Sequence, residues 1–326
     1  MNKHFSRREF IQASSATAVA SAVAHPTWPA TPVQAAAHGP FRGTLCLFSK
    51  PVPQLSWSEL AQSAKRAGFG GIDLTVRPEG HVLPERAVID LPKAVAAIRA
   101  EGIEVPMIST ALVSASDPAA EPILETASKL SIRFVKPGYY FYKFVNVIEE
   151  RDQAGREFRS LVELAEKYQI QMGYHNHTEF IGAAIWDIAP VIESLNPRGC
   201  GFYFDLCHAA MSLGENGWKV ATNLVIPRLK MVGAKDFYWK QDGQRRWRTE
   251  TCPMGQGIVP WRQFLQTLAE SNFHGPISLQ EEFPIPGVAD YRGVAISRDA
   301  VPQVMAAAKQ GLDYLKSLLR ETYQQA

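Results

Sequence analysis

The sequence predicts an α/β fold of the (βα)8, or TIM barrel, type. From about Gly43 onward, short apolar runs rich in β-branched residues alternate with longer amphipathic segments, the pattern of βα units around a parallel sheet. Eight such pairs follow one another, and eight strands with eight crossovers close a barrel without free edges. A doubly wound open sheet is the alternative, but no GxGxxG motif follows a strand to support nucleotide binding.

The expected elements follow from this alternation. The strands are expected at residues 44–48, 71–75, 103–108, 132–136, 171–175, 201–205, 229–235 and 276–279. Amphipathic helices are expected at 57–67, 91–100, 123–129, 158–168, 186–195, 261–270 and 302–321, with a weaker pattern at 217–224. Two long polar connections, 77–90 and 240–260, follow strand ends and are expected to overhang the active face of the barrel.

Composition favours a small-molecule partner. The chain has 326 residues, 46% of them hydrophobic, and its 34 basic and 32 acidic residues give a formal charge of +2. Neither sign forms a long run, so we expect no nucleic acid and no membrane surface as partner. The four cysteines lack CxxC spacing and the density of a disulfide scaffold, which predicts buried free thiols.

The first 37 residues are expected to be a signal peptide and linker, with the barrel occupying residues 38–326. Paired arginines, Arg7 and Arg8, precede a weakly apolar, Ala-rich run at 11–24, which resembles a twin-arginine export signal. We therefore expect a periplasmic or otherwise exported protein that meets the twin-arginine export machinery. An uncleaved N-terminal anchor is the alternative, but the run is too short for a convincing membrane span, so no stable membrane insertion is expected.

Ionisable side chains gather where the expected strands end. They are His175 and His177, Asp205 with His208 three residues on, Lys235 with Asp236, and Glu281 with Glu282. A barrel places its site at these ends, and a mixed nitrogen and oxygen ligand set suits a divalent ion such as Mn, Co, Zn or Mg. The sequence therefore predicts a metal site at the barrel mouth.

Each candidate also has a purely structural interpretation. A single histidine is more often hydrogen-bonded at a rim, but two histidines two apart on an extended chain point the same way. Asp205 fits a helix cap or an ion pair with Lys235 equally well. Alternation sends one of Glu281 and Glu282 inward and the other toward the helix layer, so one of them at most is a ligand.

Five stretches, in order, resemble the strand-end motifs of xylose-isomerase-like barrels, the sugar phosphate isomerases and epimerases. The stretches are Gly173-Tyr174-His175-Asn176-His177, Phe204-Asp205-Leu206-Cys207-His208-Ala209, Lys235-Asp236-Phe237, Pro253-Met254-Gly255-Gln256-Gly257 and Gly275-Pro276-Ile277-Ser278-Leu279-Gln280-Glu281-Glu282-Phe283. Each motif alone is weak, and the ordered set, spread over residues 43–319, is specific.

The resemblance implies a ligand set with two departures. Relatives hold their metal with a Glu, an Asp, a His and a final Glu, of which Asp205 and Glu282 match the Asp and the last Glu. The first Glu falls at His175 and the histidine of the seventh strand at Gly233. The resemblance therefore implies His175, Asp205 and Glu282 as metal ligands, with His177 as the alternative to His175, and His208 contacting substrate. The two departures also remove one of the two carboxylates that an epimerase uses as acid and base.

The implied reaction is sugar isomerisation or epimerisation through an enediolate of a ketose or keto-sugar. Glu282 or His177 is expected to move the proton, with Lys235 and His208 orienting or protonating a sugar oxygen. Three further residues are expected to contact substrate, although surface or packing roles suit them as well: Arg77, His81 and Trp239.

Three other functions stay open at this point. The same enolate serves a keto-sugar lyase, dehydratase or hydratase. A non-catalytic sugar-binding barrel is also compatible with the sequence. A metal-dependent phosphodiesterase like the abasic-site endonucleases would need a basic groove, which the near-neutral charge disfavours.

Overall fold

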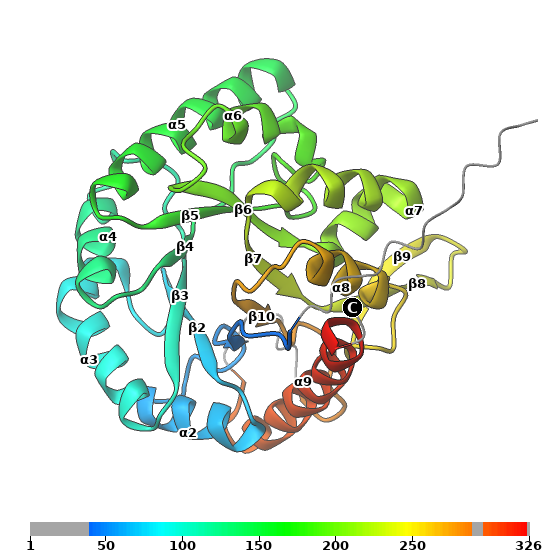
Figure 1. The fold of residues 1–326 in the computed structure, drawn as a ribbon. Coiled ribbons are helices and arrows are strands. Elements are labelled where there is room, and N and C mark those ends of the chain that lie inside the picture. The colour runs from blue at the N-terminus through cyan, green and yellow to red at the C-terminus, as the bar shows by residue number, and fades with distance from the viewer. Residues whose placement is uncertain (1–38, 289–295, 325–326) are drawn as a thin grey trace, which may run out of the picture. The chain divides into compact units, whose positions relative to one another are not determined.

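Eight parallel strands close into a barrel, as the sequence predicts (Figure 1). The computed structural model describes residues 39–288 and 296–324, so the expected twin-arginine leader lies outside the described residues. The barrel strands are β1 (Leu45–Phe48), β2 (Gly71–Val76), β3 (Glu104–Thr110), β4 (Phe134–Lys136), β5 (Gln171–His175), β6 (Cys200–Asp205), β7 (Leu229–Ala234) and β10 (Ile277–Leu279). Each end differs from its predicted position by at most two residues. Around the barrel the order is β1-β10-β7-β6-β5-β4-β3-β2.

Helices surround the barrel in the positions that the periodicity indicates. They are α2 (Trp57–Ala67), α3 (Ala87–Ala100), α4 (Ala120–Lys129), α5 (Val147–Lys167), α6 (Ala189–Glu193), α7 (Leu206–Val225), α8 (Trp261–Glu270) and α9 (Val301–Gln324). Helix α5 begins eleven residues earlier than expected, because its first turns, where Val147 and Ile148 are exposed, carry no buried apolar stripe. Asn146 caps this start and accepts from the Glu149 N–H.

Helix α7 also differs from its prediction, and this difference concerns the site. Asp205 ends β6 and its carboxylate accepts from the backbone N–H of His208, so the strand passes into the helix without a loop. The helix is broken at Gly214, whose φ of 66° is non-helical. The weak pattern expected at 217–224 is therefore the second half of a longer kinked helix.

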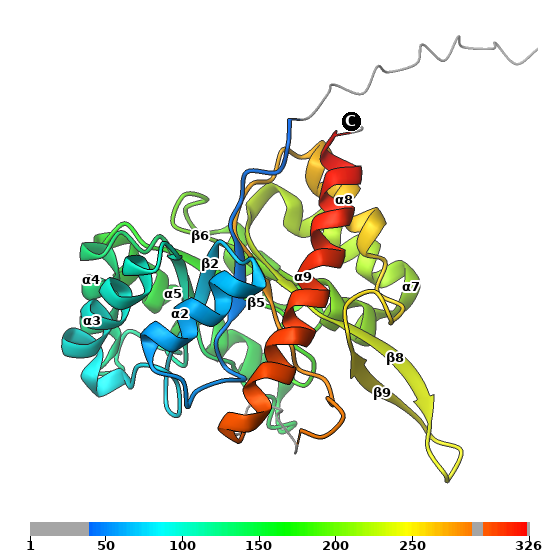
Figure 2. The ribbon, with the colours of Figure 1, turned by 90° about the horizontal axis from the view of Figure 1, so that it is seen from below.

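The long connection expected at 240–260 is partly a hairpin. Strands β8 (Asp236–Gln241) and β9 (Trp247–Cys252) pair antiparallel and extend away from the barrel strands (Figure 2). Polar and aromatic residues are mixed along them without regular alternation and with little burial, so the composition is typical of a loop although the backbone is extended.

The barrel and its helices bury a continuous apolar core. Inside the barrel it gives way to a polar layer in which Asp73 accepts from the hydroxyls of Ser109 and Ser278. The four cysteines are buried and free, as predicted. Within the described residues, no helix combines the length and the apolar character that a membrane span requires.

Candidate metal centre and barrel mouth

The carboxyl ends of the strands bring the predicted polar residues together. A cavity of about 250 Å³ opens there. Its lining includes the predicted His175, His177, Glu282 and Arg77, with Phe48, Lys50, Ser109, Lys136, Tyr139, Glu179, Phe180, Tyr203 and Gln280 around them. Asp205, His208 and Lys235 lie directly behind this lining, in contact with it.

Three buried atoms at this mouth converge without hydrogen-bond partners. They are His175 Nε2, Asp205 Oδ2 and His208 Nε2. The two imidazole nitrogens lie 3.5 Å and 3.8 Å from Asp205 Oδ2, and ligand atoms of the three residues all lie within 4.8 Å of one another. Buried polar atoms seldom lack partners, and two histidines with one carboxylate form a known metal-binding triad. This group fits a divalent metal ion.

The remaining atoms of the triad are positioned as metal ligands usually are. His175 Nδ1 lies 2.9 Å from the Tyr139 hydroxyl, and His208 Nδ1 lies 3.3 Å from Thr178 Oγ1. When each Nδ1 carries the hydrogen and donates it to these oxygens, each Nε2 lone pair faces the triad. Burial lowers the pKa of His175 to about 4, so its ring is neutral at pH 7.

Asp205 combines the two roles that the sequence left open. Its Oδ1 caps α7 by accepting from the His208 N–H, and its backbone exchanges two hydrogen bonds with the Asn176 carboxamide. Its Oδ2 is left for the triad and for Lys235, whose ammonium lies 3.4 Å away. Burial alone would raise the pKa of Asp205, but the Lys235 charge holds it below its usual range.

Glu282 faces the cavity but contacts lysines rather than the triad. Its carboxylate lies 2.5 Å from Lys50 Nζ and 3.2 Å from Lys235 Nζ. Despite burial, these two charges lower the pKa of Glu282, so it stays ionised. Lys235 also donates to Gln280 Oε1. The ligand set expected from the sequence was His175, Asp205 and Glu282; His208 occupies the third corner in the structure.

Alternation along the last strand end is as expected. Gln280 and Glu282 face inward, whereas the carboxyl of Glu281 faces α9, where Gly311 leaves room for it. Glu281 Oε1 is buried without a hydrogen-bond partner, and burial raises the pKa of Glu281 to about 8.

His177 lines the cavity beside the triad. Its Nδ1 donates to the Thr178 carbonyl at 2.7 Å, and its ring centroid lies 3.7 Å from that of His208. Burial, reinforced by the Lys235 charge, lowers the pKa of His177 to about 3, so its free nitrogen is unprotonated at neutral pH.

The three expected substrate contacts have different positions. Arg77 reaches the cavity, with its guanidinium 6.0 Å from the Phe48 ring centroid. His81 is tied to Thr75 by its backbone N–H and lies outside the cavity lining. Trp239 lines a separate cavity of about 390 Å³ between α7 and the β8–β9 hairpin, together with Trp218 and Phe237.

Several residues at the mouth were not singled out from the sequence. Lys50 follows β1, Lys136 ends β4, and Tyr139 follows β4. The strand-end rule that selected His175 and Asp205 would have identified Lys50 and Lys136 as well, because both stand where an expected strand stops.

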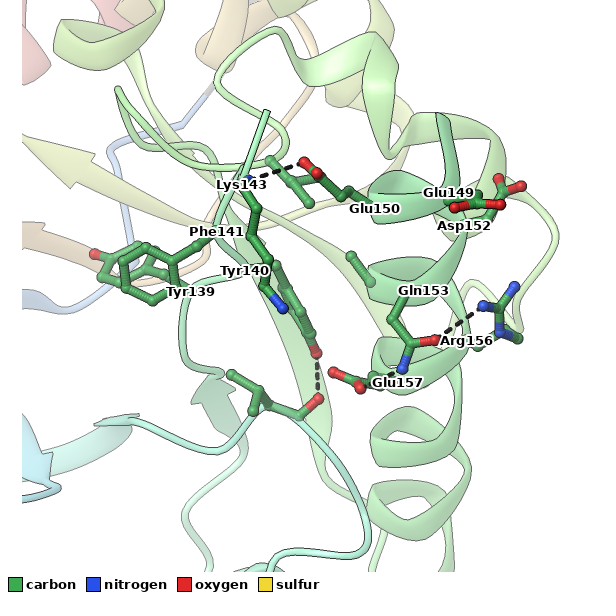
Figure 3. Close-up of a pocket in the computed structure, with 13 residues that line it drawn as sticks. Tyr139, Tyr140, Phe141, Lys143, Glu149, Glu150, Asp152, Gln153, Arg156 and Glu157 are labelled. Carbon is green, nitrogen blue, oxygen red and sulfur yellow. Dashed lines mark hydrogen bonds between the residues drawn. The ribbon is translucent and has the colours of Figure 1, made fainter. Parts of the chain in front are cut away.

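A third cavity, about 680 Å³, lies between the segment after β4 and α5 (Figure 3). The Glu150 carboxylate there accepts four backbone N–H groups, from residues 143–146. Tyr139 lines both cavities, but the histidines of the triad do not line this one. It is therefore a space beside the candidate site.

Comparison with known proteins places this architecture in a family. Residues 61–318 match the family described as xylose isomerase-like TIM barrel, and the chain belongs to it. No curated protein matches the chain.

Solved structures with the same fold include epimerases, at low sequence identity. D-psicose 3-epimerase with D-tagatose from Clostridium cellulolyticum H10 is 14% identical, covers 85% of this chain and 99% of its own, and has a TM-score of 0.63. A xylose isomerase-like TIM barrel protein from Mycobacterium smegmatis in complex with magnesium is 15% identical, with coverages of 86% and 98% and a TM-score of 0.64. The 3-keto-D-glucoside 4-epimerase from E. coli is 14% identical, with coverages of 84% and 99% and a TM-score of 0.60. At such identities the likeness establishes the fold.

Proposed function

We propose that this chain is a metal-dependent sugar isomerase or epimerase that acts on a ketose or keto-sugar through an enediolate. The observation that carries the proposal is the convergence of His175 Nε2, Asp205 Oδ2 and His208 Nε2, all buried and without hydrogen-bond partners, beside a monosaccharide-sized cavity. Membership of the xylose isomerase-like family and the epimerases among its fold relatives support the same reaction class.

A bound divalent ion would polarise a sugar carbonyl and the neighbouring hydroxyl, which makes the adjacent C–H more acidic. Glu282 is kept ionised by Lys50 and Lys235. The same two charges lower its basicity, so it would accept that proton once the oxygens of the substrate draw the ammonium groups away from it. Burial lowers the pKa of Lys235, but Asp205 and Glu282 more than reverse this effect, and the charged ammonium can donate to a sugar oxygen.

The second proton-transfer group of an epimerase would come from the other side of the mouth. Glu282 follows β10 and His177 follows β5, and two strands, β7 and β6, separate β10 from β5 around the barrel. His177 is neutral with one nitrogen free, so it can take a proton on the face opposite Glu282. When Glu282 removes the proton instead, His177 would first have to gain a proton from solvent before it could deliver one to the enediolate. A histidine would then serve where other epimerases use a second carboxylate.

The test is exchange of carbon-bound hydrogen in heavy water, with the full chain loaded with Mn, Co, Zn or Mg and offered ketoses and 3-keto-glucosides. Exchange with recovery of an epimer or isomer supports the proposal. Glu282→Gln should lower the exchange rate at least about 100-fold. The matched control is Glu281→Gln, because that neighbouring carboxyl faces α9 rather than the cavity.

Other outcomes separate the alternatives. Loss of water from the sugar after exchange would identify a keto-sugar lyase or dehydratase, which begins with the same proton removal. Sugar binding without exchange in any ketose would contradict an isomerase and favour a sugar-binding barrel.

Export belongs to the proposal as well. Paired arginines before an Ala-rich run support a periplasmic location reached through the twin-arginine machinery. Cell fractionation of the full chain beside an R7K/R8K double variant tests it, and equal distribution of the two proteins would contradict export by this route.

A further inference from the structure

We propose that the substrate carries an anionic group, a carboxylate or phosphate, which binds between Arg77 and Lys136. This inference rests on the proposed function, because it names the class of sugar that the barrel mouth accepts. It concerns the wall formed by the ends of β2, β3 and β4, away from the triad.

Lys136 is a buried lysine without an ion-pair partner. It is 3% exposed, lines the cavity, and makes no ion pair within 4.0 Å among the described residues. Its ammonium lies 3.5 Å from the Tyr139 ring centroid, a contact that offsets only part of the cost of removing a charge from water. Burial and the nearby charges of Arg77 and Lys50 lower the pKa of Lys136, so bringing an anion close would stabilise its charged form.

Arg77 is the second cation on this wall. Its guanidinium lies over the Phe48 ring, and within residues 39–288 and 296–324 the structure gives it no ion pair. A planar guanidinium with several N–H donors matches the two oxygens of a carboxylate or phosphate. Arg77 and Lys136 repel each other through the cavity, and an anion between them would turn this repulsion into two attractions.

Most other charges of the mouth already have partners, although Glu179, which also lines the cavity, has no ion pair among the described residues. Glu282 is shared by Lys50 and Lys235, and Asp205 lies beside Lys235. Asp73, an acid whose charge acts on Lys136, accepts hydroxyl hydrogens from Ser109 and Ser278, and burial raises its pKa, which favours its neutral form. Arg77 and Lys136, at the ends of β2 and β4, are therefore available to bind an anionic group of the ligand.

The positions of these groups also give the substrate an orientation. Ser109 of β3 lines the cavity between the strand ends that carry Arg77 and Lys136. An anion held there leaves the rest of a six-carbon chain to extend toward His175 and Glu282, which line the same cavity of about 250 Å³. That volume lies just below the usual range for ligand pockets, about 300 to 1,000 Å³, and suits one monosaccharide unit.

The experiment compares three sugars that differ at one carbon: D-fructose, 2-keto-D-gluconate and D-fructose 1-phosphate. Affinities are measured by calorimetry with the metal-loaded full chain, at low and high salt. We expect one of the two anions to bind at least tenfold more tightly than D-fructose, with a preference that shrinks at high salt. The two anion arms distinguish a sugar acid from a sugar phosphate.

Two variants and one control tie the preference to these residues. Arg77→Gln and Lys136→Met should each reduce the affinity for the anion at least tenfold and leave that for D-fructose within about twofold. Lys143→Gln is the control, because Lys143 follows the same strand but lines the neighbouring cavity (Figure 3). Lys136→Met should also melt no lower than the parent, because it removes an unpaired buried charge.

Equal binding of all three sugars, or anion binding unchanged in both variants, would overturn this inference even if ketoses exchange hydrogen. A melting temperature lowered by Lys136→Met would also contradict it, since that result indicates a lysine paired within the fold. Anion binding that depends on Arg77 and Lys136 without any hydrogen exchange would support the anion site and contradict the proposed reaction instead.

Discussion

Gly233 of β7 pairs with Asp205 of β6, and a Cβ at Gly233 would lie only 3.0 Å from Asp205 Oδ2. The carboxylate therefore occupies the space into which a side chain of the seventh strand would project. The histidine that the family resemblance implied at this strand is absent, and His208, from the first turn of α7, reaches Asp205 Oδ2 from the other side.

This arrangement predicts the ligand set. His175→Ala and His208→Ala should each weaken metal binding more than about 100-fold, because each removes one ligand from a three-residue set. Glu282→Gln should keep its metal, since Glu282 contacts Lys50 and Lys235. Metal analysis after dialysis measures both. Metal lost from Glu282→Gln but retained in His208→Ala would favour the set expected from the sequence.

Lys235 should oppose metal binding while assisting catalysis. Its ammonium lies 3.4 Å from the same Asp205 oxygen that faces the triad, so it repels a second cation there. Lys235→Met should bind the metal at least about tenfold more tightly and yet turn over more slowly, because the ammonium no longer serves the substrate. Calorimetry with Mn or Zn measures the metal affinity, and an activity assay measures the turnover rate. Weaker metal binding in Lys235→Met would contradict it.

Tyr139 should matter for metal affinity and little for folding. Its hydroxyl contacts His175 Nδ1 and fixes the ring so that Nε2 faces Asp205. Tyr139→Phe should lower metal affinity about 10- to 100-fold, the usual effect of removing such a partner. Tyr140→Phe is the matched control, because the Tyr140 hydroxyl donates to the Val113 carbonyl outside the site. Equal losses in both variants would contradict a role for Tyr139 in holding the ligand.

Glu281 should make folding stability depend on pH. Burial raises its pKa to about 8 in the folded chain, against about 4.3 in an unfolded one. Below pH 4 the carboxyl is protonated in both states; between about pH 4.3 and 8 the unfolded state releases the proton first. Stability from this group is therefore full at low pH and is lost as pH rises toward 8.

Glu281→Gln, which resembles the protonated acid, should remove that loss. We expect its free energy of unfolding to exceed that of the parent by about 2 kcal/mol at pH 7 and to match it near pH 4.5, within the range that a few pKa units allow. Urea unfolding at the two pH values measures it, with Glu270→Gln, on α8, as control. A constant difference across this range would contradict a proton-linked effect.

The sequence by itself determined the barrel and the end at which its site lies. Periodicity locates strands because the buried side of a strand must be apolar, whichever strands and helices pack against it. All eight barrel strands were predicted in this way. The polar residues that interrupt each pattern at a strand end, such as His175 and Asp205, are visible for the same reason. The β8–β9 hairpin was not predicted from the sequence, because its two faces are mostly exposed and its residues show no apolar alternation.

Only the tertiary structure decided which of these side chains meet. Glu282 pairs with Lys50, 232 residues away along the chain, and such a distance leaves no mark in local sequence pattern. The proposed roles of His208 and Lys136 likewise depend on their neighbours in the fold. These neighbours leave His208 Nε2 without a hydrogen-bond partner and place the Lys136 ammonium over the Tyr139 ring. In a closed barrel, strands that are far apart in the sequence end at the same mouth, and their arrangement there decides which charged side chains pair. Only folding produces this arrangement.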